Sequence, residues 1–223
     1  MARTAVTEVG APASHTSEAT RLEAFSDGVF AIVITLLVIE LRVPSVDETR
    51  AAGGLLDALA HHWPSFVAYA ISFLVIGIEW INHHAMFQYI RRVDRTLLLL
   101  HIPFFLVVAV IPYTTAVLAE HLRGPWARSA ALLYGAVFTA NAVTFNLIWW
   151  HGVRDPYLLG PDVHREGLRT ISSRYRFGAL FYLAATALAF VSVALSLAVH
   201  ALLALLFALP ERRRVVAKAG GAA

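Results

Sequence analysis

The residue whose type and position most clearly indicate a functional role is Asp27. It is a carboxylate roughly two helical turns inside the first apolar stretch of the chain. An ionised side chain at the centre of a bilayer costs about 3 kcal/mol, and less near the interface, so Asp27 should face protein or water and have a partner. Arg21 is the nearest cation, but its spacing from Asp27 puts the two side chains on different faces of a helix. We therefore expect Asp27 to pair across helices or subunits as a structural node, or else to cap a helix end near the headgroups.

The same stretch carries a stripe of large aliphatic residues at helical spacing, formed by Ile32, Leu36 and Ile39. Thr35 lies on the same side, and its hydroxyl either bonds back to the carbonyl of Ala31 or faces a wet lumen. A helix that faces lipid shows the same pattern, so the stripe alone does not decide between a lipid-facing and a water-facing surface.

A second polar cluster is predicted near the end of the next apolar stretch and in the one after it. Its members are Glu79, Trp80, His83, His84 and His101. Glu79 with His83, and Trp80 with His84, stand one helical turn apart and share a face. Such a network would hold the first helix against its neighbours and respond to pH, because histidine has an unperturbed pKa of about 6.5. The alternative is that His83 and His84 lie solvated at the membrane interface.

Metal chemistry is not indicated. The chain has no cysteine, so a thiolate site is impossible. The adjacent His61 and His62 point in different directions on a helix, and neither they nor His83 and His84 form the repeated histidine boxes of membrane metalloenzymes. We expect no resident metal, no cofactor and no enzymatic activity.

The elements that carry these residues are apolar helices. Hydrophobic residues make up 58% of the chain, charged residues 15%, and the mean hydropathy is +0.65, which favours the bilayer as solvent. The final apolar block would be roughly 50 Å long as one helix, too long for a single span, so we divide it near Ser192. The expected helices cover about 21–43, 64–86, 97–118, 127–150 and, in two parts, 177–209. Thr20 and Glu23 predict a capping box at the first start.

The distribution of basic residues predicts the orientation. With the N-terminus in the cytosol, only Arg42, Arg50, Arg123 and Arg128 of the 18 basic residues fall outside. This favours an all-α protein with six transmembrane helices and both termini cytoplasmic, since five spans would put the basic cluster at 212–214 outside. We expect a disordered cytoplasmic tail over 1–17, a six-helix domain over 18–210 and a basic cytoplasmic tail over 211–223. The net charge of +3 is therefore read by position and does not indicate nucleic-acid binding.

The start of the first helix is identified by a motif, Arg-x-x-x-Phe-Ser-Asp, complete here at Arg21, Phe25, Ser26 and Asp27. With the continuation GVFAIVITLL and the spacing of Trp80 and His84, the chain resembles the transmembrane protein 175 family, the endolysosomal potassium channels and their prokaryotic relatives. The resemblance covers about residues 18–209. One departure is His101, where the family pattern would have asparagine.

This resemblance implies a potassium-selective channel of the bacterial plasma membrane, a homotetramer built around four copies of the first helix. The family has no carbonyl filter, and its constriction is a ring of aliphatic side chains that matches Ile32 here. Leu36 and Ile39 would form the next rings outward, and Thr35 would help to favour potassium over sodium. The implied partners are further copies of the chain in a homotetramer, the lipid bilayer and permeant monovalent cations. Two alternative interpretations are kept: a channel for protons or for monovalent cations without preference, and a secondary transporter. Most transporter folds built from inverted repeats have more helices than this chain.

Overall fold

The computed structural model describes residues 14–160, 163, 168, 172–173 and 175–208, and within them the fold is helical. The expectations for 1–13 and 209–223 lie outside the described residues. The long helices are α1 (Ser14–Leu36), α4 (Trp63–Met86), α5 (Arg95–His121) and α6 (Ala127–Arg154). The shorter elements are η1 (Leu37–Glu40), α2 (Val46–Ala51), α3 (Leu55–His61), α8 (Gly178–Ala187), η2 (Leu188–Phe190) and α9 (Val193–Ala208).

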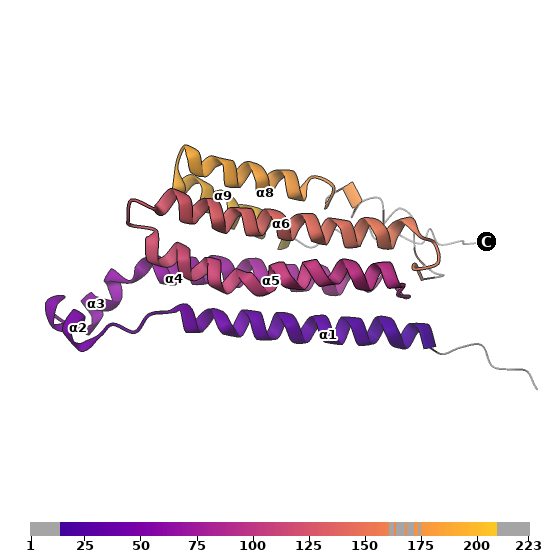
Figure 1. Cartoon of the computed structure of the whole chain (residues 1–223), viewed down its shortest axis with the longest axis horizontal. Coiled ribbons are helices and arrows are strands. Elements are labelled where there is room, and N and C mark those ends of the chain that lie inside the picture. Colours follow the sequence, from indigo (N-terminus) through magenta and orange to yellow (C-terminus); the bar gives the residue numbers. More distant parts are fainter. Residues whose placement is uncertain (1–13, 161–162, 164–167, 169–171, 174, 209–223) are drawn as a thin grey trace, which may run out of the picture.

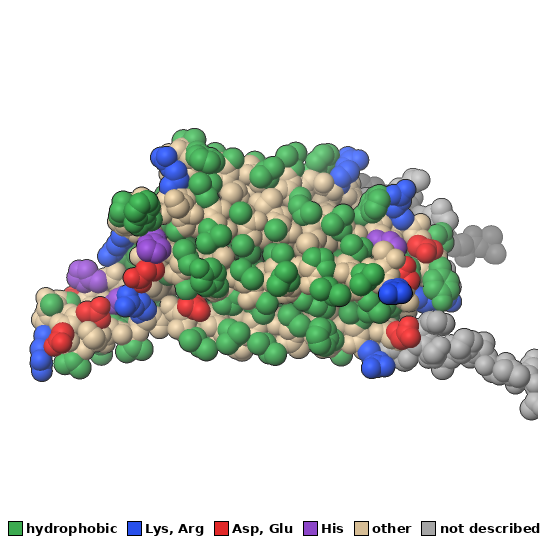
Figure 2. All heavy atoms as spheres, in the orientation of Figure 1, with side chains coloured by type: hydrophobic (Ala, Val, Ile, Leu, Met, Phe, Trp, Pro, Cys, Tyr) green, Lys and Arg blue, Asp and Glu red, His purple; other side chains and the backbone are tan. Residues whose placement is uncertain are grey.

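The long helices lie side by side, with α1 along one edge and α8 and α9 along the opposite edge (Figure 1). The short helices α2 and α3 project from the end of the bundle where η1 finishes. Figure 2 shows apolar side chains over the middle of this face, whereas charged side chains gather toward the two ends. An apolar band between two charged ends is the surface expected of a protein that sits in a bilayer.

Within the described residues, four helices are long and apolar enough to cross a membrane. They have 23 to 28 residues, which corresponds to roughly 34 to 42 Å and exceeds the hydrocarbon core. The segments Gly178–Phe190 and Val193–Ala208 are apolar but shorter. The all-α prediction is confirmed, and the count of six spans stays a prediction.

The boundaries depart from expectation mainly at the start of α1. The helix begins at Ser14, so Thr20 lies inside it and the predicted capping box at Thr20 and Glu23 is wrong. A capping box is present instead at Ser45 and Glu48, at the start of α2. The predicted break near Ser192 is confirmed, since η2 ends before it and α9 begins after it, with the Ser192 hydroxyl accepting from the amide of Leu195 at 3.3 Å.

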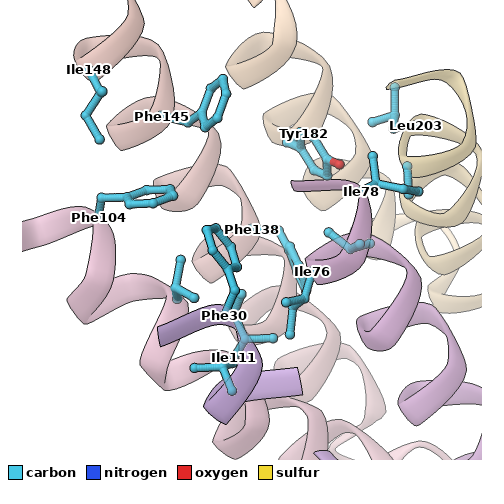
Figure 3. Packing of buried hydrophobic residues seen from close by; sticks show 14 of the residues in the cluster. Phe30, Ile76, Ile78, Phe104, Ile111, Phe138, Phe145, Ile148, Tyr182 and Leu203 are labelled. Atoms are coloured by element: carbon cyan, nitrogen blue, oxygen red, sulfur yellow. The ribbon is translucent and has the colours of Figure 1, made fainter. Parts of the chain in front are cut away.

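A continuous core joins α1 to the rest of the bundle. Phe30 from α1 packs with Phe104 from α5 at 6.0 Å between ring centroids, and both are buried (Figure 3). On the other side of the bundle α6 and α8 approach closely at Gly135. A Cβ atom there would clash with the side chain of Thr186, so only glycine permits this contact.

Candidate functional site

Helix α1 and η1 have two distinct faces. The buried face is a stripe at helical spacing, formed by Leu22, Ser26, Phe30, Val33 and Leu37, and it packs on α4 and α5. The opposite face is apolar and uncovered by the rest of the chain: Phe25, Ile32, Leu36 and Ile39 are 62%, 61%, 42% and 72% exposed. The three residues of the predicted aliphatic stripe therefore lie on the face of α1 and η1 that the subunit leaves open.

Thr35 lies on this open face. Its hydroxyl is within hydrogen-bond distance of two carbonyls of the preceding turn, 2.8 Å from that of Ala31 and 2.9 Å from that of Ile32. The hydroxyl thus donates its hydrogen bond within the helix, while its oxygen can still accept a hydrogen bond from the exposed side.

The signature end of α1 is attached to α4 by two side-chain contacts one turn apart. The indole of Trp80 donates to Asp27 at 2.9 Å, and the Nδ1 atom of His84 lies 2.9 Å from a carboxylate oxygen of Glu23. The two acidic residues stand four apart on α1 and their partners four apart on α4, so the contacts form a short antiparallel ladder. Asp27 is partnered across helices, by a neutral donor and not by Arg21, which is exposed.

Two other residues of the motif contribute differently. The Ser26 hydroxyl is buried and donates to the carbonyl of Leu22 at 2.8 Å, so it is satisfied within its own helix. Phe25 is largely exposed but contacts the edge of Phe105 on α5 at 5.4 Å between ring centroids. The motif thus supplies a buried small polar residue, an aromatic contact and a carboxylate to the region where α1 packs against α4 and α5.

The histidines split into two environments. His84 is half-exposed beside Glu23, whereas His83 is fully buried and lies 3.3 Å from His101, measured between the two Nε2 atoms. His101 uses its Nδ1 atom toward the carbonyl of Leu97 at 2.7 Å. Because a carbonyl only accepts, this nitrogen donates, His101 accepts from His83 through Nε2, and Nδ1 of His83 is a buried acceptor without a hydrogen-bond partner among the described residues. The solvated alternative is therefore wrong for His83.

Glu79 does not join the contacts of α1. It is buried on the other side of α4, where its carboxyl accepts a hydrogen bond from the side-chain amide of Asn141 on α6. The predicted set of site residues thus divides into an α1–α4 ladder, an α4–α5 histidine pair and an α4–α6 pair. Among the described residues no group of three metal-ligating side chains is assembled, and His61 uses its ring toward the carbonyl of Asp57 at 2.7 Å.

One contact at the signature end was not predicted from the sequence. Asp94 accepts from the amide of Leu97 at 2.7 Å as the N-cap of α5, and its carboxylate also lies 2.9 Å from the ring of His151 at the end of α6. An aspartate directly before an apolar run is a helix-start signal, so the cap was recognisable from the sequence. The partner on α6, 57 residues away, was not.

The fold and the uncovered α1 face define an integral membrane protein of packed apolar helices. Residues 21–112 match the family described as endosomal/lysosomal potassium channel TMEM175. A potassium channel of Streptomyces collinus is 48% identical over 192 residues, 86% of this chain and 92% of that protein. The crystal structure of a lysosomal potassium-selective channel TMEM175 homolog from Chamaesiphon minutus superposes with a TM-score of 0.79 at 42% identity, covering 86% of this chain and 97% of that one.

The chain therefore belongs to the TMEM175 family, a family of ion channels. Vertebrate relatives match over a shorter part. The endosomal/lysosomal proton channel TMEM175 of Gallus gallus is 33% identical over 135 residues, which are 58% of this chain and 27% of the chicken protein.

Proposed function

We propose that the chain is one subunit of a homotetrameric, potassium-selective channel of the bacterial plasma membrane, with four copies of α1 around the pore. Each subunit crosses the membrane six times, its two tails over 1–17 and 211–223 are cytoplasmic, and it needs no cofactor beyond the permeant ion. The observation that carries the proposal is the similarity to the solved potassium-selective channel homolog, and the uncovered apolar face of α1 supports it. A subunit in a symmetric ring would turn that face toward the axis.

On this proposal Ile32 forms the narrowest ring, with Leu36 and Ile39 in the next rings and Thr35 beside them. An apolar neck blocks ions by excluding water, and a modest widening rewets it. Selectivity for potassium then depends on shape and partial dehydration, with the oxygen of Thr35 as the nearest polar group. The name of the Streptomyces relative, a potassium channel, supports the choice of ion.

The test is a planar-bilayer recording of the purified protein and of Ile32→Asn. A polar ring should wet the neck, so the current should rise or lose its preference for potassium. The matched control is Ile102→Asn on α5, because Ile102 is 62% exposed and Ile32 is 61% exposed. Unchanged conductance and selectivity in Ile32→Asn, or the same change in both variants, would contradict Ile32 as the constriction.

A second candidate is a channel that conducts protons or several monovalent cations. The name of the vertebrate relatives, a proton channel, favours it. Reversal potentials measured under separate potassium, sodium and pH gradients distinguish the two candidates. Saturable, coupled flux without single-channel currents would instead indicate a secondary transporter.

A further inference from the structure

A separate cavity, with a few polar side chains in a mostly apolar lining, lies on the side of α4 that faces away from α1. It has a volume of about 70 Å³ and is bounded by α4, α6, α8 and α9, with no residue of α1 in its lining. Figure 3 shows Phe138, Phe145 and Tyr182, three of its aromatic walls, between α6, α8 and α4. Its polar lining consists of Glu79, Asn82, Asn141, Asn146, Tyr175 and Tyr182.

The first unusual feature of this cavity is that the carboxyl group of Glu79 is buried without a cation beside it in the described part of the chain. The residue is 9% exposed, and its hydrogen-bond partner, Asn141, is neutral. No lysine, arginine or histidine lines the cavity in the described part of the chain. His83, one turn along α4, faces His101, and His200 on α9 uses its ring toward the carbonyl of Ser196. Burying an ionised carboxylate without a cation is unfavourable because the charge loses its hydration, and a bound proton removes that cost.

The second unusual feature is an unpaired acceptor. The Oδ1 atom of Asn141 is buried without a hydrogen-bond partner among the described residues, and Asn141 as a whole is 4% exposed. Two donors of the lining are committed elsewhere: Asn146 donates to the carbonyl of Ala142 at 2.7 Å, and Tyr175 donates to Asn82 at 3.3 Å. A proton on Glu79 supplies one missing donor, and water supplies more.

The cavity has room for that water. One water molecule needs about 10–15 Å³ of the volume that the centre of a water-sized sphere can reach, and two or more polar partners. Several water molecules therefore fit in a cavity where this volume is about 70 Å³. The amide of Asn141 also suits both states of Glu79. Its nitrogen donates to the ionised carboxylate, and after rotation of the amide its oxygen accepts from the protonated acid. A proton can therefore bind and leave with little change in packing.

We propose that Glu79 and Asn141 form a hydrated proton-binding site inside each subunit, apart from the face of α1. The site binds one proton on the carboxyl of Glu79 and water in the cavity beside it. It links the protonation state of the subunit to the contact between α4 and α6. Because the site lies within one subunit, its test does not require the protein to conduct ions.

The test is infrared difference spectroscopy of the purified full-length protein in lipid nanodiscs, titrated from alkaline to acidic buffer. The wild type should keep the C=O band of a protonated, buried carboxylic acid in neutral buffer, where exposed carboxyl groups are ionised. The band should shift in heavy water, because the proton exchanges with the hydrated cavity. Glu79→Gln should lose the band. The control Glu120→Gln should keep it, because the Glu120 side chain is 54% exposed on α5.

A second variant keeps the proposal testable if Glu79→Gln does not fold. Asn141→Leu keeps the acid but removes its hydrogen-bond partner, so the band should move to higher frequency. A spectrum identical in wild type, Glu79→Gln and Asn141→Leu would overturn the proposal. So would a carboxylate band of Glu79 that moves when potassium is exchanged for a large organic cation, since the site would then hold a metal cation.

Discussion

The hydrogen bond between Trp80 and Asp27 should be a principal attachment of α1 to α4, and Trp80→Phe tests it. The variant keeps the aromatic ring but removes the donor that lies 2.9 Å from the carboxylate. A hydrogen bond to a charged group contributes about 1.5–3 kcal/mol when buried. Trp80 is 43% exposed, so water partly replaces the lost donor. We therefore expect a loss of about 1–2 kcal/mol in the free energy of unfolding per subunit.

The assay is unfolding of the protein in mixed micelles by increasing SDS, followed by circular dichroism. A double-mutant cycle with Asp27→Ala isolates the pair, and the coupling free energy should be about 1 kcal/mol. Trp126→Phe is the control, since Trp126 is a 64% exposed tryptophan between α5 and α6. A coupling free energy near zero, or an equal loss in Trp126→Phe, would refute the assigned attachment.

Three further outcomes are expected. Gly135→Ala should destabilise the α6–α8 contact by about 1–3 kcal/mol, measured by thermal unfolding, and Thr186→Ala should restore much of the loss; no rescue would contradict the close contact. The pKa of Glu48 lies below its usual range because the backbone amide and side chain of Ser45 bond to it. The stability this gives α2 is present above the unfolded pKa and lost as the pH falls through the folded one. Corrected for the intrinsic exchange rate at each pH, the protection of the α2 amides should therefore fall in acid, but it should not change with pH in Glu48→Gln, whose side chain does not titrate. Asp94→Ala should cost about 1 kcal/mol of unfolding free energy in the micelle assay, and Asp94→Ser should recover the capping part; equal losses in both would contradict the cap.

The apolar stretches could be located from the sequence because hydropathy is a local property. The second expected helix, 64–86, and the break near Ser192 agree with the structure to within a residue or two. The start of α1 could not be located from the sequence, because a Thr-x-x-Glu pattern occurs inside helices as well as at their ends. The helix continues back to Ser14 without using Thr20 as a cap.

The partners of the polar residues were harder to predict. Sequence spacing shows which side chains share a helix face, but not which helix that face meets. It therefore argued against Arg21 as the partner of Asp27 and predicted a partner on another helix or subunit, but it did not identify the indole of Trp80, 53 residues away. It also grouped Glu79 with His83, although the two residues face different helices, α6 and α5.

The distribution of contacts along α1 bears on how a ring of these helices would widen. At the signature end, Trp80 and His84 hold α1 through two polar contacts with partly covered side chains. At the other end a polar contact joins Arg42 to Glu120 at 3.0 Å, where both side chains are more than half exposed. Exposed ion pairs contribute little, so that end is held mainly by apolar packing, which has no preferred direction. In the proposed tetramer, a tilt of α1 about its signature end therefore breaks fewer directional contacts than a translation of the whole helix.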